Sequence, residues 1–324
     1  MLTKNNRPYY RRPPIGSIKT LAKVLSIKSG ELISLALHAN AMYRVAKKIE
    51  KKNGDIRITY DANSKLKIIQ KRIKSRILDQ VYYPHYLQGG ISDPQFPRDY
   101  LRNAQMHTNN GTLISDDILK FFPSVSRFYI RNLWQNLFNF PPVVAECLTS
   151  LTVKDNELPQ GACTSTHLAN LIFWDSEPEL VQVFERKNMT YTRFIDDINI
   201  STNDIISAKK KSFVIRGIHR MFNNKGLSPN RNKIEVSSQG FTASGKKASI
   251  HNLNIGKHKV ALTKSVRNSI RAAVKDCELS KINNVDDEII EKLMRSAYGR
   301  VRRYKKLHPI PGIKLLNRLD TINS

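Results

Sequence analysis

Paired aspartates are the residues of this sequence with the most distinctive potential chemistry. They occur three times, as Asp116-Asp117, Asp196-Asp197 and Asp286-Asp287. The first pair follows a short apolar run typical of a strand. The second lies between two runs rich in Thr, Tyr, Phe and Ile, which predict a β-hairpin with the acids at its tip. Phosphoryl transfer by two metals needs hard oxygen ligands that bridge Mg²⁺ ions roughly 3.5 to 4 Å apart, and Asp117 and Asp196 suit that chemistry.

Each pair also has an explanation without chemistry. An Asp-Asp turn such as Asp196-Asp197, taken alone, is more often simply solvated. Asp286-Asp287 follows two asparagines and precedes an apolar periodic run. Acids in the first turn of a helix offset the positive end of its dipole, so we assign this third pair a structural role.

The charge balance points to a polyanionic partner. Among 324 residues, 54 Lys and Arg face 27 Asp and Glu, which gives a formal net charge of +27. With 40% hydrophobic residues the chain has enough material for a core, which excludes disorder. An excess of positive charge repels itself in the folded state, so an excess of this size is best explained by a partner with a phosphate backbone. No apolar run approaches the roughly 18 residues of a spanning helix, and the N-terminus lacks the apolar segment of a signal peptide. We therefore expect a cytoplasmic protein without membrane contact.

The elements that would position these acids are mixed. Apolar periodicity predicts one or two helices over residues 21–46, a strand over 56–60, and helices over 66–81 and 100–107. The middle third alternates short strands with helices, which indicates an α+β layer rather than a regular βαβ repeat. After about residue 257 the sequence predicts basic helices.

Basic residues alternate with tyrosines in two places. The first is Arg7, Tyr9, Tyr10, Arg11 and Arg12, and the second is Arg300, Arg302, Arg303, Tyr304, Lys305 and Lys306. Such clusters combine phosphate charge with stacking faces, as single-stranded nucleic acid binding requires. Solvated surface charge is the alternative, and the net charge of the whole chain favours binding.

Further motifs stand in a fixed order around the acids. Leu158-Pro159-Gln160-Gly161 lies between the two pairs, and Lys225-Gly226-Leu227 with Asn230 and Lys233 follows them. With Phe194-Ile195-Asp196-Asp197 as a YxDD hairpin that has Phe in place of Tyr, this order resembles the palm of reverse transcriptases. Each motif alone is weak, since the LPQG segment is also an ordinary turn, but the shared order makes coincidence improbable.

The resemblance narrows to one branch of that family. Asn103-Ala104-Gln105-Met106-His107 is similar to the NAxxH element of retron reverse transcriptases, although a helix with a buried histidine would explain it equally well. Residues 57–70 resemble their fingers segment. One departure is Ile250-His251-Asn252, where the retron enzymes usually carry a VTG triplet.

The resemblance implies a right-hand polymerase of class α+β with fingers, palm and a short helical thumb. We expect a basic helical extension over residues 1–54, fingers and palm over 55–256, and an RNA-binding thumb over 257–324. Asn103 and His107 would contribute to RNA binding, as would the basic cluster that contains Arg300, Arg302, Arg303, Lys305 and Lys306.

The resemblance also implies roles at the metal site. Asp117, Asp196 and the backbone carbonyl of Ile118 would hold two Mg²⁺ ions, while Asp197 would be a ligand or orient one. The spacing to the following aromatics fits Asp117, so Asp116 is treated as a bystander. Lys233 would protonate or neutralise the leaving pyrophosphate, unless it is a solvated surface lysine.

A second set of residues would bind the nucleotide. Phe122, five residues after Asp117, stands where the family places an aromatic under the incoming sugar and would favour dNTPs over ribonucleotides, unless it is a core residue beside Phe121. Gln160 and Gly161 would line the template and nucleotide pocket. Arg57 and Lys65 are the candidates for contacts with the triphosphate.

The function implied is an RNA-directed DNA polymerase of the retron type. It would reverse transcribe a cognate structured noncoding RNA, primed from a 2′-hydroxyl, into branched RNA-linked single-stranded DNA, in antiphage defence with a separate effector protein as partner. The alternatives are a group II intron-like or abortive-infection reverse transcriptase and, from a different class, a noncatalytic RNA-binding protein on a polymerase scaffold.

Overall fold

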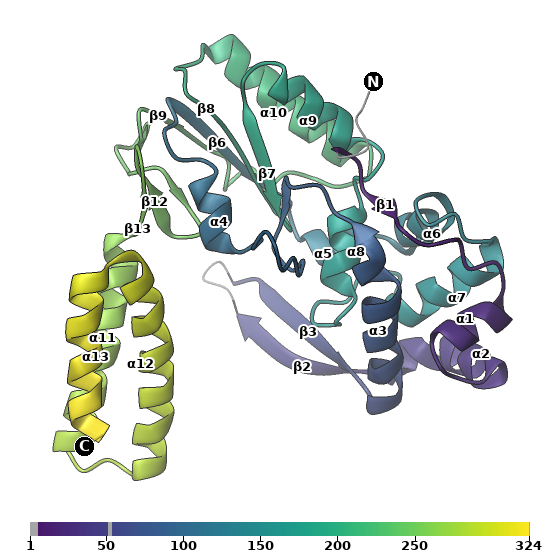
Figure 1. The fold of residues 1–324 in the computed structure, drawn as a ribbon, viewed down its shortest axis with the longest axis horizontal. Coiled ribbons are helices and arrows are strands. Elements are labelled where there is room, and N and C mark those ends of the chain that lie inside the picture. Colours follow the sequence, from purple (N-terminus) through teal and green to yellow (C-terminus); the bar gives the residue numbers. More distant parts are fainter. Residues whose placement is uncertain (1–5, 51–53, 324) are drawn as a thin grey trace. The chain divides into compact units, whose positions relative to one another are not determined.

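The chain folds into two compact units (Figure 1). Each unit is built from several segments, and the segments of the two units alternate along the sequence. A computed structural model describes residues 6–50 and 54–323. The first unit comprises the residues up to 103, 114–202 and 206–235. The second comprises 104–113, 203–205 and the residues from 236 onward. Both combine helices with strands, which confirms the predicted α+β class.

The N-terminal part of the first unit begins with two short helices and continues into an exposed hairpin. Its elements are β1 (Tyr9–Tyr10), α1 (Ile18–Val24), α2 (Ser29–His38), a 3₁₀ turn (Ala39–Met42), β2 (Tyr43–Glu50), β3 (Ile56–Ala62) and α3 (Ser64–Arg76). The predicted helix over 21–46 is wrong from Tyr43 onward, because β2 pairs antiparallel with β3 there. The helix predicted over 66–81 ends at Arg76; a 3₁₀ turn (Leu78–Gln80) and β4 (Val81–Tyr82) follow.

Strands of the first unit bring the two candidate acid sites together. They are β5 (Leu87–Gln88), β6 (Thr112–Asp117), β7 (Thr190–Phe194) and β8 (Asp197–Thr202), and they lie in the order β6-β8-β7-β5. The β7–β8 pair is the predicted hairpin, with Phe194 opposite Asp197. The two Asp-Asp pairs therefore lie at the ends of neighbouring strands, β6 and β8.

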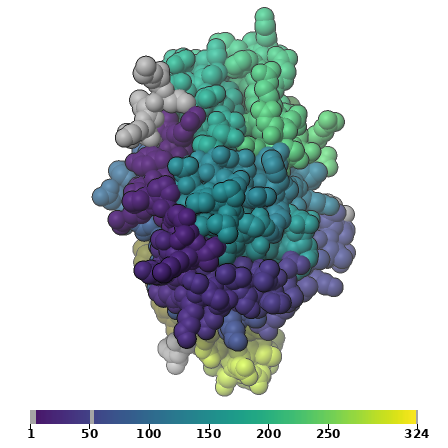
Figure 2. All heavy atoms as spheres, turned by 90° about the vertical axis from the view of Figure 1, so that its right-hand side faces the viewer, coloured from purple at the N-terminus to yellow at the C-terminus, as the bar shows by residue number. Residues whose placement is uncertain are grey.

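Further helices follow α3 along the chain. They are α4 (Tyr100–Gln105), α5 (Phe121–Ser124), α6 (Arg127–Asn136), α7 (Pro142–Thr152), α8 (Ser165–Leu171), α9 (Glu177–Glu185) and α10 (Ala208–Asn223). Helices α9 and α10 lie side by side next to the β7–β8 strands (Figure 1). Figure 2 shows the N-terminal segment lying across the surface formed by α6 and α7. Tyr10 packs there against Phe138 and Phe140, so this tyrosine is a packing residue.

The second unit contains short hairpins and a bundle of three helices (Figure 1). Its strands are β9 (Glu235–Ser238), β10 (Phe241–Thr242), β11 (Ser249–Ile250), β12 (Leu253–Ile255) and β13 (Val260–Leu262), and its helices are α11 (Lys264–Ile282), α12 (Asp287–Leu307) and α13 (Pro309–Asn323). The Asp286 carboxylate caps α12 by accepting from the backbone N–H of Glu288 and Ile289, which confirms the structural role of the third acid pair. His251 and Asn252, in place of the VTG triplet, form a tight turn with positive φ at both residues.

The unit boundaries differ from the divisions expected after residues 54 and 256. The described residues before 54 group with the first unit, and those from 236 onward group with the second. Residues 1–5 and 51–53 of the expected N-terminal extension and its border lie outside the described part. Within the described ranges, no helix has both the length and the apolar character needed to cross a bilayer.

Candidate active site

The hairpin tip that carries Asp196 is held in an unfavourable backbone conformation. Its two-residue loop consists of Ile195 and Asp196, and Ile195 has φ +62°. A β-branched residue rarely adopts positive φ, and such strain typically costs about 1–3 kcal/mol. The surrounding structure must therefore hold the tip in place.

A buried arginine supplies that support. The Arg193 guanidinium is fully buried and donates to the carbonyl oxygen of Ile195 (2.9 Å). It also donates to both carboxylate oxygens of Glu177, at 2.6 and 2.8 Å, and to the carbonyl of Asn170. Because a buried cation is tolerated only with such partners, the position of Ile195 is coupled to an ion pair in the core.

Asp117 ends β6 and is fixed to the segment after α10. The backbone N–H of Asn230 donates to the Asp117 carbonyl (2.7 Å), and the Lys233 ammonium donates to Asp117 Oδ2 (2.6 Å). The N–H of Ile118 donates to the carbonyl of Asp196 (3.2 Å). These contacts bring Asp117, Asp196 and Lys233 to one place, as the sequence predicted.

Burial and mutual repulsion make the acids reluctant to ionise together. The pKa of Asp196 is raised, mainly by burial and secondly by the negative charge of Asp117. Burial and the charges of Asp196 and Asp117 raise the pKa of Asp197 to about 7. Partial burial acts to lower the pKa of Lys233, but its hydrogen bond to Asp117 and the three acid charges raise it overall. A site with this excess of negative charge favours cations.

Asp117 and Asp196 border a cavity of about 1140 Å³ within the first unit. Asp117, Asp196 and Ile118 line it together with four basic residues, which are Arg57, Lys74, Lys120 and Lys233. Carboxylates and positively charged side chains thus line the same cavity. This combination is required to bind metal ions and a polyphosphate at once.

The LPQG segment forms one wall of the cavity and packs on β3. Gln160 accepts from Tyr60 N–H through its carbonyl (2.7 Å), and its side-chain oxygen accepts from Arg57 Nε (2.9 Å). Gly161 has φ +105°, and a Cβ there would lie 2.6 Å from the Tyr60 carbonyl oxygen. Only glycine fits this close approach, so Arg57, Gln160 and Gly161 are assembled as the sequence predicted.

The two phenylalanines after Asp117 have different environments. Phe121 is buried and stacks on Phe173, with ring centroids 6.3 Å apart. Both phenylalanines border the cavity, but Phe122 is only half-buried. The core alternative therefore applies mainly to Phe121, and the more exposed Phe122 is placed where it can meet a substrate.

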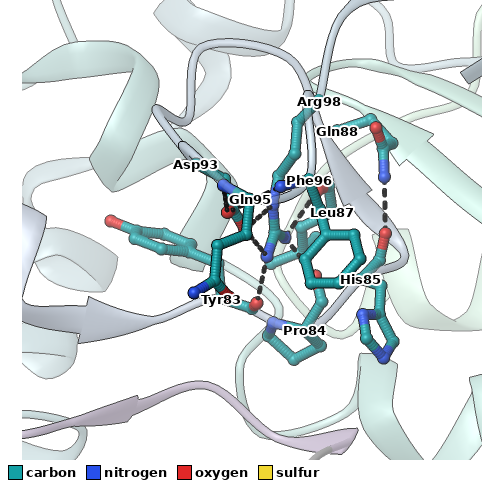
Figure 3. A network of polar contacts seen from close by, with 9 residues as sticks. All are labelled: Tyr83, Pro84, His85, Leu87, Gln88, Asp93, Gln95, Phe96 and Arg98. Atoms are coloured by element: carbon teal, nitrogen blue, oxygen red, sulfur yellow. Dashed lines mark hydrogen bonds and ion pairs between the residues drawn. The ribbon is translucent and has the colours of Figure 1, made fainter. Parts of the chain in front are cut away.

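A polar network organises the loop that forms another part of the wall (Figure 3). The Arg98 guanidinium donates to the carbonyls of Tyr83, Pro84 and Leu87 and to the carboxylate of Asp93. The loop delivers Gly90 to the cavity, where an added Cβ would lie 2.1 Å from the Thr166 methyl carbon. Arg98 thereby fixes a wall that no sequence motif indicated.

Lys65 is not where the sequence placed it. It is exposed on α3 and does not line the cavity, whereas Lys74 does. The two lysines are nine residues apart, which puts them on roughly opposite sides of a helix at about 100° per residue. Lys74 was missed because periodicity alone does not show which side of α3 faces the acids.

The residues predicted to bind RNA divide into buried and exposed sets. Asn103 and His107 are fully buried, and burial lowers the pKa of His107 to about 3. They present no surface to RNA, so the expected direct contact is not what the structure provides. Arg300, Arg302, Lys305 and Lys306 are exposed on α12, while Arg303 is half-buried.

The N-terminal cluster is largely engaged with the protein itself. Tyr9 stacks on Tyr82 with ring centroids 5.1 Å apart, and Arg11 lies over the same ring. Arg7 forms an ion pair with Glu179 (3.7 Å). These contacts fasten the segment to the first unit, although Tyr9, Arg11 and Arg12 keep exposed surface.

The carboxylates provide the right donors for hard divalent cations but not a closed cage. In the described part of the chain, no group of three His, Cys, Asp or Glu side chains is arranged to hold an ion alone. Asp117 and Asp196 nevertheless offer carboxylate oxygens to one cavity, and the Lys233 ammonium already occupies one Asp117 oxygen as a cation. Open sites of this kind are completed by water and phosphate oxygens.

Comparison with known proteins decides the family. Residues 49–265 match the family model described as reverse transcriptase (RNA-dependent DNA polymerase). The retron Se72 reverse transcriptase of Salmonella heidelberg is 33% identical, covering 98% of this chain and 82% of that protein. The chain belongs to the retron reverse transcriptases. It is therefore an RNA-directed DNA polymerase, and the noncatalytic alternative is set aside.

A second retron enzyme and one solved structure also align with the chain. The retron Ec48 reverse transcriptase of Escherichia coli is 29% identical over 92% of this chain and 74% of that protein. Among solved structures, telomerase from Candida albicans in complex with a telomeric RNA fragment aligns with a TM-score of 0.39 and 11% identity, over 65% of this chain and 46% of that chain. That likeness is too weak to add to the assignment.

Proposed function

We propose that this retron reverse transcriptase copies a cognate structured noncoding RNA into single-stranded DNA that remains joined to the RNA through a branch. Priming would start from a 2′-hydroxyl of that RNA, and two Mg²⁺ ions would support nucleotidyl transfer. The observation that carries the proposal is that Asp117 and Asp196 line one cavity with Arg57, Phe122 and Lys233. The enzyme would act in the cytoplasm.

Asp117 and Asp196, with the carbonyl of Ile118, would hold the metal ions, and Asp197 would ligate or orient one of them. When bound, the ions lower the pKa of the attacking hydroxyl and neutralise charge on the phosphates. Lys233 lies at Asp117 and would move to the leaving pyrophosphate as metal replaces it. Its ammonium group is suited to neutralise charge on the leaving pyrophosphate or to donate a proton to it.

The nucleotide would enter between the hairpin of β2 and β3 and the acids. Arg57, held by Gln160 at 2.9 Å, would grip the triphosphate through its remaining N–H groups. Lys74 is a second candidate, in place of Lys65. Phe122 would pack under the sugar and exclude a 2′-hydroxyl.

The RNA would bind through phosphate contacts from exposed basic residues. Arg300, Arg302, Lys305 and Lys306 lie along α12 and are the strongest candidates in the second unit. In the cell the enzyme and its DNA product would serve antiphage defence with a separate effector protein.

The proposal is tested by expressing the protein in bacteria with its flanking DNA and sequencing the nucleic acid that copurifies. Samples are compared with and without RNase and debranching enzyme, and with Asp196→Asn as the inactive control. We expect a short DNA joined to one small RNA by a debranchable bond. Bound RNA without DNA, identical for the wild type and Asp196→Asn, would contradict the proposal.

A further inference from the structure

Asp116 is a carboxylate beside the active site that none of the roles above uses. Its side chain has no exposed surface and does not line the cavity. Oδ1 accepts from the backbone N–H of Asp117 (2.8 Å), and Oδ2 lies 2.8 Å from His219 Nε2 on α10. One buried carboxylate thus joins a helix to the main chain of a candidate metal ligand.

Strand geometry explains why neighbouring acids serve different ends. Successive side chains of β6 point to opposite faces, so Asp117 reaches the cavity while Asp116 reaches α10. A buried carboxylate is costly unless it is fully hydrogen-bonded, and burial raises the pKa of Asp116. Because a buried carboxylate contributes little net stability even when it is hydrogen-bonded, folding alone gives a weak reason for an acid here.

The His219 ring packs against a row of aromatic side chains. Its ring stacks on Phe222 (6.2 Å between centroids), and Phe222 packs on Phe173 (5.9 Å). Phe173 in turn stacks on Phe121, in the segment that follows Asp117. Turning the imidazole away would therefore break its stack on Phe222, which is part of an aromatic row that ends next to the acids.

We infer that Asp116 and His219 form a positioning pair that fixes the peptide of Asp117 and so aims its carboxylate at the divalent cations. Asp117 is then held at three points: its N–H by Asp116, its carbonyl by Asn230 and its side chain by Lys233. The third contact must be released when metal binds, which leaves the two backbone contacts to orient the ligand. The inference rests on the metal role proposed for Asp117.

Variants separate hydrogen bonding from charge and from folding. Asp116→Asn keeps an oxygen for the Asp117 N–H and offers N–H to the imidazole, which accepts in its other tautomer. His219→Gln keeps a donor, whereas Asp116→Leu and His219→Leu remove the contacts. Asp286→Leu, which loses the α12 cap, is the control for an acid with a purely structural role.

The decisive measurement is the affinity of the purified protein for Mn²⁺ in the absence of RNA and nucleotide. Binding is monitored by electron paramagnetic resonance. Supporting groups of this kind typically change metal affinity by 10- to 100-fold. We expect at least about tenfold weaker binding for His219→Leu and Asp116→Leu, and binding within about threefold of wild type for Asp116→Asn and His219→Gln. Asp286→Leu should lower the melting temperature and leave Mn²⁺ binding unchanged.

Two results would overturn the inference. One is wild-type Mn²⁺ affinity in a folded His219→Leu protein, and the other is a loss in Asp116→Asn as large as in Asp116→Leu, which would make charge the active property. If Asp116→Leu does not fold, the Asn, Gln and His219→Leu variants still decide. DNA synthesis by the wild type is measured in parallel. If the wild type synthesises DNA and the variants bind Mn²⁺ as tightly as the wild type, only the positioning pair is rejected. A wild type that neither synthesises DNA nor binds Mn²⁺ rejects the proposed function as well.

Discussion

The Arg193 guanidinium donates a hydrogen bond to the Ile195 carbonyl, so a buried cation supports the residue with φ +62° that leads into Asp196. Arg193→Met should destabilise the fold by about 3–5 kcal/mol, because the buried Glu177 loses its cationic partner, although it keeps the hydrogen bond from the Tyr191 hydroxyl. Adding Glu177→Gln should restore much of the stability but not DNA synthesis, since the Ile195 carbonyl still lacks its donor. Denaturant unfolding and primer extension on both variants check this. Recovery of synthesis together with stability would show that Arg193 acts only through folding.

The role of Asp117 and Asp196 in DNA synthesis should be separable from RNA binding. Asp117→Asn and Asp196→Asn should each reduce primer extension by several orders of magnitude, because each removes charge that holds metal, while RNA affinity stays near wild type. Extension assays and filter binding measure the two properties. Asp286→Asn is a matched control, since that acid caps a helix. Near-normal extension by either active-site variant would refute the metal assignment.

Phe122 should control the choice of sugar. Phe122→Ala opens space under the incoming nucleotide and should raise ribonucleotide incorporation by at least about tenfold relative to dNTPs. Competition assays with paired dNTP and NTP measure the ratio. Phe121→Leu, one residue earlier and in the core, should lower the melting temperature without changing that ratio. Equal discrimination by wild type and Phe122→Ala would make Phe122 a packing residue.

Metal binding should depend on pH through Asp197. Its pKa of about 7 lies above the unfolded value of about 3.9, so in the metal-free protein its contribution to stability is lost as pH rises from about 4 through 7. Divalent cations bind the ionised form, so their stabilising effect should grow over the same range. Melting temperatures with and without MgCl₂ at pH 6, 7 and 8 test this. A Mg²⁺-induced shift that is the same at all three values would contradict the expectation, and Asp197→Asn should flatten the dependence.

The basic face of α12 should contribute salt-dependent RNA affinity. Replacing Arg300, Arg302, Lys305 and Lys306 by Gln should weaken RNA binding and lower the slope of log affinity against log salt by up to about 0.7 per lost contact on single strands. Four exposed basic residues of α10, which are Lys209, Lys210, Arg216 and Arg220, provide a control of equal charge. Equal effects of both sets would mean that net charge, not α12, drives binding.

Local patterns in the sequence located the hairpin but did not by themselves identify the site. Alternating apolar residues predicted the two strands around Asp196 and Asp197, because strand periodicity depends on neighbours within a few positions. The choice of Phe122 over Phe121 and the role given to Gly161 rested on the resemblance to reverse transcriptases, since the local pattern alone also fits a core phenylalanine and an ordinary turn.

Features that depend on packing were missed or misplaced. Tyr43 begins a strand because β3 pairs with it, which periodicity over residues 21–46 does not reveal. His107 and Asn103 have polar side chains that suggested a surface, but both are enclosed. His219 is 103 positions from Asp116, and nothing in the spacing indicates that they meet.

The exchange of segments between the two units has a consequence for how the protein is made. The chain passes from one unit to the other after residues 103, 113, 202, 205 and 235. On the ribosome, residues 104–113 leave the exit tunnel long before the segment from 236 onward, which supplies the partners of Asn109 and Gly111. Domains usually fold in turn from the N-terminus during synthesis, but here the earlier segment has to wait. Completion of the second unit therefore has to wait until the residues from 236 onward have been synthesised, long after the acids of the first unit have left the ribosome.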